Sequence, residues 1–192
     1  MGYIERKQRG KESVRKSILD AALNIAVKEG WHSVTIRKIA DAIEYTPPIV
    51  YEHFENKEDL IRELILSGFR ELLKGFISAK EMETDPKKVL MQVSLNQWDY
   101  AFKNKELYQL MFSLERPIHN EETTAAFMVI RDVFMQVSKD DEQLAYVLMA
   151  NWMCLQNGTI STFMSMPTPP ALSKIPPKEL FKSFIERFLN SI

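Results

Sequence analysis

The chain has 192 residues, of which 45% are apolar, a formal net charge of −1 and a single cysteine, Cys154. This length and apolar content are enough to bury a core in one large or two small globular domains, and one cysteine excludes an internal disulfide framework and suits a reducing compartment. The first residues lack the apolar core of a signal peptide, and the longest apolar stretch, which begins at Leu144, is too short and interrupted to span a bilayer. We therefore expect a cytoplasmic protein with no membrane partner.

Helical periodicity recurs from end to end, without strand alternation, so we expect an all-α fold of about nine helices. The first helix is predicted from about Ser13 to Glu29. Gly30 follows it directly, and glycine is the residue that most easily takes the left-handed conformation at the end of a helix.

Two short helices are predicted between Thr35 and about Phe54. Thr35 can cap the first of them, whose apolar residues follow at helical spacing. A break is expected at Glu44. Thr46 is predicted to cap the second helix, because Pro47 and Pro48 are tolerated in a first turn but not inside a helix.

A long helix is predicted from Lys57 to about Lys80, because Asn56 offers a cap, Asp59 follows it three residues later and apolar residues continue at helical spacing. Caps and breaks place the later helices in the same way. We expect them from Asp85 or Pro86 to about Lys103, from Glu106 to about Leu114 with an end at Pro117, from Glu121 to about Val137, from Asp140 or Asp141 to about Met164, and from about Pro177 onward. The proline-rich segment 166–177 has no window compatible with a helix and is predicted to be an ordered loop or a short linker.

The stretch 35–57 resembles the helix-turn-helix of the TetR family of bacterial transcriptional repressors. The resemblance is carried by Tyr51, His53, Phe54 and Lys57, extends back through Thr35, Arg37, Ile39 and Ala40, and includes Ile18, Ala22, Leu23, Ala26 and Gly30. Two positions depart from the family pattern: Glu44 stands where glycine is usual in the turn, and Pro48 stands where a small residue is usual. Glu44 is expected to be strained if the turn keeps a positive φ.

The resemblance implies a DNA-binding domain over residues 1–57 and a helical effector-binding and dimerisation domain over 58–192. It implies phosphate contacts by some residues and base-facing positions for others. The phosphate set is Thr35, Tyr51, His53 and Lys57, and the base-facing set is Arg37, Thr46, Pro47, Pro48 and Ile49. Arg37 can hold a guanine edge through two hydrogen bonds, whereas proline and isoleucine can only touch a thymine methyl or follow groove shape, so Arg37 and Thr46 are predicted to carry most direct readout.

Charge is unevenly distributed along the chain. Residues 1–57 carry a net charge of +2 and the remainder −3, and six of the ten bases in the first part precede residue 17. Such a basic terminus can be a solvated, disordered arm, or it can contact DNA phosphates or the minor groove beside a helix-turn-helix. The sequence leaves both interpretations open.

The second domain places polar and aromatic residues on otherwise apolar helix faces. Buried amides need partners, so these residues can face a cavity for a small, largely apolar effector. They can equally bond one another, a neighbouring helix or a dimer partner. The candidate effector-binding residues are Asn96, Tyr100, Tyr108, Phe112, Phe127, Trp152 and Gln156.

The apolar stripe from Leu180 to Ile192 is wider than one neighbouring helix would cover. With the resemblance, it predicts a homodimer formed through the last two helices. The three histidines are scattered and no glycine-rich phosphate loop occurs, so we expect neither an enzyme nor a cofactor or metal. The leading hypothesis is an effector-released repressor of a pseudo-palindromic DNA operator. The alternative is a helical protein-interaction module with a degenerate helix-turn-helix.

Overall fold

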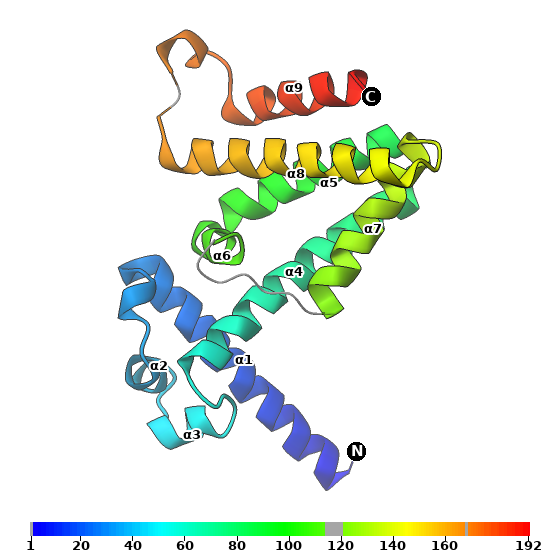
Figure 1. Ribbon diagram of the computed structural model, residues 1–192. Coiled ribbons are helices and arrows are strands. Elements are labelled where there is room, and N and C mark those ends of the chain that lie inside the picture. The colour runs from blue at the N-terminus through cyan, green and yellow to red at the C-terminus, as the bar shows by residue number, and fades with distance from the viewer. Residues whose placement is uncertain (1, 114–120, 168) are drawn as a thin grey trace. The chain divides into compact units, whose positions relative to one another are not determined.

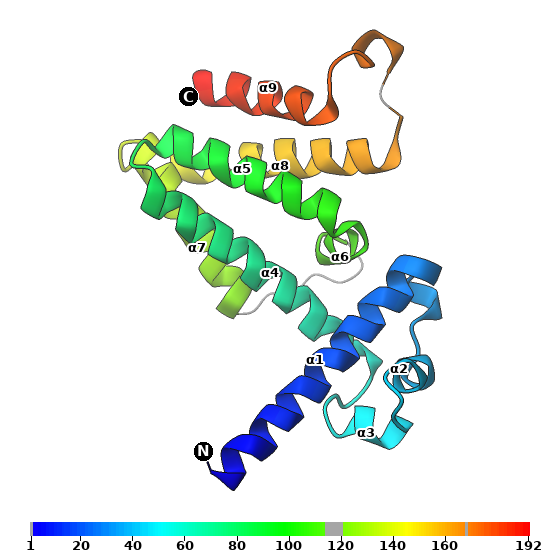
Figure 2. The same cartoon turned by 180° about the vertical axis from the view of Figure 1, so that it is seen from behind.

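The computed structural model describes residues 2–113, 121–167 and 169–192. All regular elements in these residues are helical, with nine α-helices and two short 3₁₀ turns, which confirms the predicted all-α fold. The chain divides into two compact units, Met1–Ser67 and Gly68–Ile192 (Figures 1 and 2). We call them the N-terminal unit and the C-terminal unit. No helix in the described ranges is long and apolar enough to cross a membrane.

The first helix, α1, spans Tyr3–Glu29 and so begins ten residues before the predicted start at Ser13. The sequence pattern missed its first turns because residues 8–13 are all exposed and so contribute no apolar periodicity. The basic N-terminal segment is therefore helical from Tyr3. Gly30 ends the helix as predicted, with φ 82°.

A 3₁₀ turn over Trp31–Ser33, which the sequence did not predict, leads into α2 (Ile36–Ala42) and α3 (Pro47–Tyr51). Thr35 caps α2 through its side chain, which accepts a hydrogen bond from the Lys38 amide at 3.2 Å. Thr46 occupies the N-cap position of α3 but makes no side-chain cap bond, contrary to expectation. The two prolines that follow have no amide to donate, and the next amide, of Ile49, bonds the Thr46 carbonyl instead at 3.0 Å.

The long helix α4 spans Lys57–Met82 and crosses the division between the units. Asn56 caps it as predicted, because its side-chain oxygen accepts from the Asp59 amide at 2.8 Å. The sequence placed the domain boundary at the beginning of this helix. The first turns of α4 lie within the N-terminal unit, which extends to Ser67, and Leu60, Ile61 and Leu64 are buried there.

The C-terminal unit contains the rest of α4 and the remaining helices, α5 (Pro86–Lys103), α6 (Lys105–Met111), α7 (Glu121–Val137), α8 (Glu142–Ser165) and α9 (Pro177–Asn190). Asp85 and Asp141 cap α5 and α8, as the sequence indicated. The predicted helix end near Leu114 and Pro117 lies outside the described residues. The proline-rich segment contains a short 3₁₀ turn, Pro170–Leu172, where no helical window was expected.

The core of the C-terminal unit forms where α5 packs against α7, α8 and α9, and α8 lies between α7 and α9. Trp98 of α5 is 5% exposed and meets Phe181 of α9 and Phe163 of α8, with ring centroids 4.8 and 5.6 Å away. Trp152 of α8 lies edge-to-face against Phe134 of α7 at 5.7 Å. These aromatic contacts tie the four helices into one scaffold.

Candidate functional site

The turn between α2 and α3 is tightened by main-chain hydrogen bonds. The amides of Ile43, Glu44 and Tyr45 all bond carbonyls of α2, and Glu44 adopts φ 59°. A non-glycine residue in this left-handed region is strained by about 1–2 kcal/mol. The turn does keep a positive φ without a glycine, so the condition under which strain was expected at Glu44 is met.

The base-facing set lies at or beside α2 and α3 with much of its surface accessible. Arg37, Thr46 and Pro48 are exposed, and Pro47 and Ile49 are half-buried. The Thr46 side chain makes no cap hydrogen bond, and Arg37 forms no ion pair within the described ranges. Both side chains are thus available to an external partner.

The phosphate set lies at the beginning of α2, at and after the end of α3, and at the beginning of α4. Thr35 is exposed, Tyr51 is 55% exposed, and His53 and Lys57 are half-buried. Lys57 Nζ donates to the Trp31 carbonyl at 3.4 Å, which holds this cation beside the beginning of α2. Hydroxyl, imidazole and ammonium groups are the usual donors to phosphate oxygens.

Arg15 of α1 fixes the segment that follows α3. Its guanidinium donates to the His53 carbonyl at 2.9 Å, pairs with Glu63 of α4 at 3.0 Å and lies 4.3 Å from the centroid of the Phe54 ring. Burial, together with the positive charges of Lys11 and Arg15, lowers the pKa of His53. His53 is therefore neutral near pH 7 in the free protein and can donate only one hydrogen bond at a time to a phosphate.

The acidic residues Glu44, in the turn after α2, and Glu52, directly after α3, are exposed. They oppose the approach of a polyanion, while Arg37 and Lys57 favour it. The surface thus offers few charge contacts and a largely apolar second helix. This arrangement suits contact with a nucleic-acid backbone and groove shape more than a dense hydrogen-bond code.

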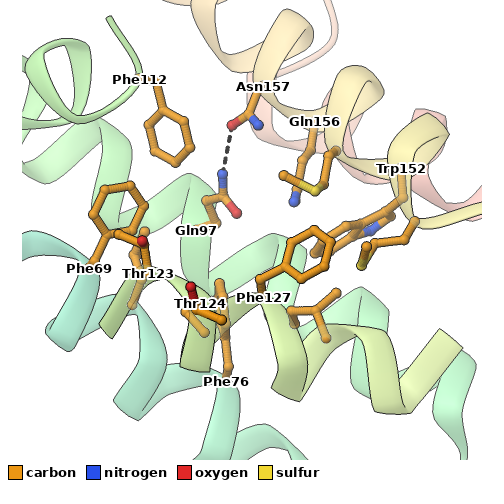
Figure 3. Close-up of a pocket in the computed structure, with 15 residues that line it drawn as sticks. Phe69, Phe76, Gln97, Phe112, Thr123, Thr124, Phe127, Trp152, Gln156 and Asn157 are labelled. Carbon is orange, nitrogen blue, oxygen red and sulfur yellow. Dashed lines mark hydrogen bonds between the residues drawn. The ribbon is translucent and has the colours of Figure 1, made fainter. Parts of the chain in front are cut away.

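The C-terminal unit contains a cavity of about 480 Å³ between α4, α5, α7 and α8 (Figure 3). This volume lies within the range of about 300–1,000 Å³ typical of small-molecule sites. Aromatic, aliphatic and thioether side chains form most of its wall, and the described residues that line it carry no charge. The lining residues are Phe69, Leu72, Phe76, Gln97, Phe112, Thr123, Thr124, Ala126, Phe127, Ile130, Met149, Trp152, Met153, Gln156 and Asn157.

A hydrogen-bonded cluster closes one side of the cavity. Gln97 Nε2 donates to Tyr108 Oη and to Asn157 Oδ1, both at 2.9 Å, and Tyr108 Oη donates to the same Asn157 oxygen at 2.8 Å. Burial raises the pKa of the Tyr108 phenol, so this hydroxyl keeps its proton at neutral pH. Trp152 Nε1 donates to Ser94 Oγ at 3.0 Å, which fixes the indole in the cavity wall.

The structure brings some of the predicted effector residues together and separates others from them. Phe112, Phe127, Trp152 and Gln156 line the cavity, and Tyr108 bonds two of the lining residues. Their role in binding stays a prediction.

Two of the predicted effector residues, Asn96 and Tyr100, do not line the cavity. Asn96 accepts from Gln92 and donates to the Gly75 carbonyl at 3.3 Å, so its amide is used inside the fold. Tyr100 Oη bonds Met111 Sδ at 3.7 Å, and burial raises its pKa to about 12.

Sequence reasoning missed Gln97 and Asn157. The buried face of α5 is centred on Leu90, Ser94, Gln97 and Ala101, one residue away from the face through Asn96 that the pattern suggested. A glutamine inside this apolar stripe was the available signal, because a buried amide requires a partner. No cluster of metal-ligating side chains occurs among the residues that the structure describes.

The N-terminal unit and its exposed second helix define the chain as a helix-turn-helix protein. Residues 18–64 match the family model described as bacterial regulatory proteins, tetR family. This match assigns residues 18–64, and with them the helix-turn-helix, to the tetR family of bacterial regulatory proteins.

The chain is similar to several curated transcriptional regulators over part of its length. It is 38% identical over 66 residues to the transcriptional repressor KstR2 of Rhodococcus jostii, covering 34% of this chain and 32% of the relative. It is 26% identical over 98 residues to the transcriptional activator FasR of Mycolicibacterium smegmatis, covering 51% and 45%. The chain thus spans less than half the length of these two relatives.

Solved structures resemble the chain over nearly its whole length. A protein of unknown function from Rhodococcus sp. RHA1 aligns with TM-score 0.74 at 17% identity, covering 93% of this chain and 94% of that protein. A TetR/AcrR-family regulator from Thermobifida fusca aligns with TM-score 0.69 at 16% identity, covering 93% and 97%. At this identity the similarity establishes the fold alone.

Proposed function

We propose that the protein is a transcriptional repressor that binds a pseudo-palindromic DNA operator as a homodimer and is released by a small, largely apolar effector. The observation that carries the proposal is the helix-turn-helix surface, where Arg37, Thr46 and Tyr51 stay exposed around a helix with an unoccupied N-cap hydroxyl. In a dimer, the two copies of α3 would enter successive major grooves about 34–36 Å apart.

Selection of bound DNA from a random pool tests the proposal directly. We expect a symmetric consensus with two half-sites, bound more weakly as salt rises because phosphate contacts release counterions. The double variant Arg37→Ala, Lys57→Ala should lose most affinity for the selected sequence. The matched control is Lys74→Ala, Lys80→Ala, which removes the same charge from exposed positions in the second half of α4.

Equal binding by the wild type and the Arg37→Ala, Lys57→Ala variant would reject the operator assignment. It would favour the alternative of a protein-interaction module with a degenerate helix-turn-helix. Glu44, Pro48 and Glu52 are the residues that motivate this alternative.

The cavity supports the effector part of the proposal. Phe69, Leu72 and Phe76 of α4 line it, and the same helix begins at Lys57 in the phosphate set. An effector that prefers one position of these side chains would shift α4 and change the separation of the two copies of α3. A preference of about 1–3 kcal/mol is typical of such coupling.

Exposed apolar residues on α8 and half-buried aromatic residues on α9 support the dimer. Leu144 and Val147 are 43% and 50% exposed, while Phe184 and Phe188 are half-buried although both lie on the stripe of the last helix. A twofold contact between the α8 and α9 pairs would cover these side chains.

Light scattering at micromolar concentration tests the dimer. We expect Val147→Glu to shift the protein toward the monomer. The control Ile77→Glu changes another exposed aliphatic residue, on α4, and should leave the mass unchanged. A monomeric wild type would refute the dimer.

A further inference from the structure

The positive charge of the N-terminal unit is concentrated at the beginning of the chain. Residues 1–17 contain six bases and two acids, whereas residues 18–57, which include the helix-turn-helix, contain four bases and six acids. The part of DNA affinity that does not depend on sequence comes from cations that neutralise phosphates. Because the helix-turn-helix segment has a net charge of −2, cations outside it have to supply most of this part.

Lys11 of α1 lies on the side of the helix that meets the phosphate set. It precedes Arg15 by one helical turn, about 5.4 Å along the axis. Arg15 in turn donates to the His53 carbonyl at 2.9 Å. Burial, and after it the charge of Lys11, lowers the pKa of His53, while the carboxylate of Glu52 raises it. The Lys11 ammonium therefore lies near the His53 imidazole.

The charge of Lys11 is available to an external partner. The Arg15 guanidinium, by contrast, is paired with Glu63 at 3.0 Å. Lys11 is exposed and has neither an ion pair nor a side-chain hydrogen bond within the described ranges. Figures 1 and 2 show the beginning of α1 and the short helix α3 reaching the same end of the N-terminal unit. A duplex that contacts α3 would thus also approach the first half of α1.

The helical form of this segment decides which part of a duplex it meets. An α-helix with its side chains is about 10–12 Å across, whereas the minor groove of DNA is about 6 Å wide. Since α1 is helical from Tyr3, its main chain stays outside the minor groove. The proposed function assigns the major groove to α3. The phosphate backbone between the grooves is the remaining contact for the cations of α1.

We propose that Lys11 is a further phosphate-contacting residue, through which the first half of α1 holds the DNA backbone beside the half-site that α3 enters. This assignment rests on the proposed DNA-binding function and extends its contact surface from residues 35–57 to α1. Lys11 should add affinity for any duplex without preferring a base sequence, because phosphate contacts carry no sequence information directly.

Fluorescence anisotropy with the full chain tests the contact on two duplexes of equal length, one with the selected sequence and one with an unrelated sequence. Binding is measured from about 50 to 200 mM salt. We expect Lys11→Gln to weaken both duplexes by the same factor. The slope of log affinity against log salt should become shallower by about 0.9 for each copy on the duplex, which at about 0.1 M salt is an affinity loss of roughly tenfold per copy.

Two control variants remove the same charge from other positions of α1. Lys16→Gln alters an exposed residue that lies about 100° around the helix from Arg15. Lys28→Gln alters an exposed residue in the last turn of the helix. Both controls should change the affinity and the salt slope much less than Lys11→Gln does.

Titration of the His53 imidazole by NMR, without DNA, tests the position of Lys11 separately. The pKa of His53 should rise in Lys11→Gln, because one of the two cations that lower it is removed. It should change less in Lys28→Gln, whose cation lies at the other end of α1. This readout reports the free protein and does not depend on any DNA sequence.

Unchanged affinity and slope in Lys11→Gln, an unchanged His53 pKa, or an equal loss in either control would overturn the assignment. A loss confined to the selected duplex would also overturn it, because that result indicates a base contact. A wild type that binds the two duplexes equally would reject the operator, whereas an equal loss of both in Lys11→Gln would still support the phosphate contact. The two failures are therefore distinguishable.

Discussion

Replacing Arg15 by methionine should destabilise the N-terminal unit and disturb its DNA-facing surface. Arg15 bonds the His53 carbonyl, pairs with Glu63 and covers the Phe54 ring, so one side chain connects α1, the segment after α3 and α4. Methionine preserves part of the apolar packing on Phe54 but removes the guanidinium. The segment that carries His53 then loses the hydrogen bond that Arg15 donates to it from α1.

The expected loss follows from the three contacts. A hydrogen bond from a charged donor contributes about 1.5–3 kcal/mol. The ion pair adds no more than about 1 kcal/mol, because the Arg15 side chain is 38% exposed and is screened by water. The cation–π contact adds about 0.5–1 kcal/mol. Contacts of one side chain are not additive and the methionine recovers some packing, so we expect a net loss of about 2 kcal/mol.

Hydrogen exchange of the amides in α1, α2 and α3 measures this loss as a lower free energy of opening. The control Lys16→Met removes a neighbouring exposed cation and should change it by less than about 0.5 kcal/mol. Operator affinity should also fall in Arg15→Met, because the phosphate set is no longer held in place. A loss below about 0.5 kcal/mol, or equal losses in the two variants, would refute the reasoning.

Other substitutions test local features of the fold. Glu44→Gly should stabilise the N-terminal unit by up to about 1 kcal/mol in urea denaturation, because it removes the backbone strain of a non-glycine residue at φ 59°. Part of this gain is lost, because glycine raises the conformational entropy of the unfolded chain. Gly68→Ala should destabilise the C-terminal unit by about 1–3 kcal/mol, because its added Cβ would lie 2.9 Å from Tyr100 Oη. Gly75→Ala is the control: its added Cβ has its closest neighbour at 3.6 Å, so it should stabilise the same helix by about 0.5–1 kcal/mol. Burial and two neighbouring cations lower the pKa of His53 below its ordinary value of 6.5. As the pH falls below 6.5, the unfolded chain therefore binds a proton before the folded one does, and the free energy of unfolding falls. Denaturation curves at about pH 7.5 and 5.5 should show a smaller fall in His53→Gln than in the wild type. Stability of the wild type that is constant over this interval would contradict the last expectation.

Local signals predicted the helices well where they carry caps or breakers. Thr35, Asn56, Asp85 and Asp141 each accept an amide hydrogen bond at the helix start that the sequence indicated. These signals act over three or four residues, so neighbouring side chains suffice to reveal them. The early start of α1 escaped prediction because an exposed helix has no apolar period to detect.

The candidate sites differ in how far sequence could predict them. The DNA-facing set is contiguous, from Thr35 to Lys57, so one local pattern contains it. The cavity draws residues from four helices, and its key amides, Gln97 and Gln156, lie 59 positions apart in the chain. Periodicity indicates which face of one helix is apolar but not which residue of another helix it meets.

The sequence by itself therefore determined the all-α class, the helix-turn-helix and the residues around its turn, because hydrogen bonding within a few residues specifies them. Only the tertiary structure decided which buried amides are satisfied. Asn96 bonds the Gly75 carbonyl of α4, Gln97 bonds residues of α6 and α8, and the buried Gln156 Oε1 has no hydrogen-bond partner among the described residues. Hydrogen bonding at a buried side chain depends on atoms brought close by packing between helices, and that proximity is absent from the order of residues along the chain.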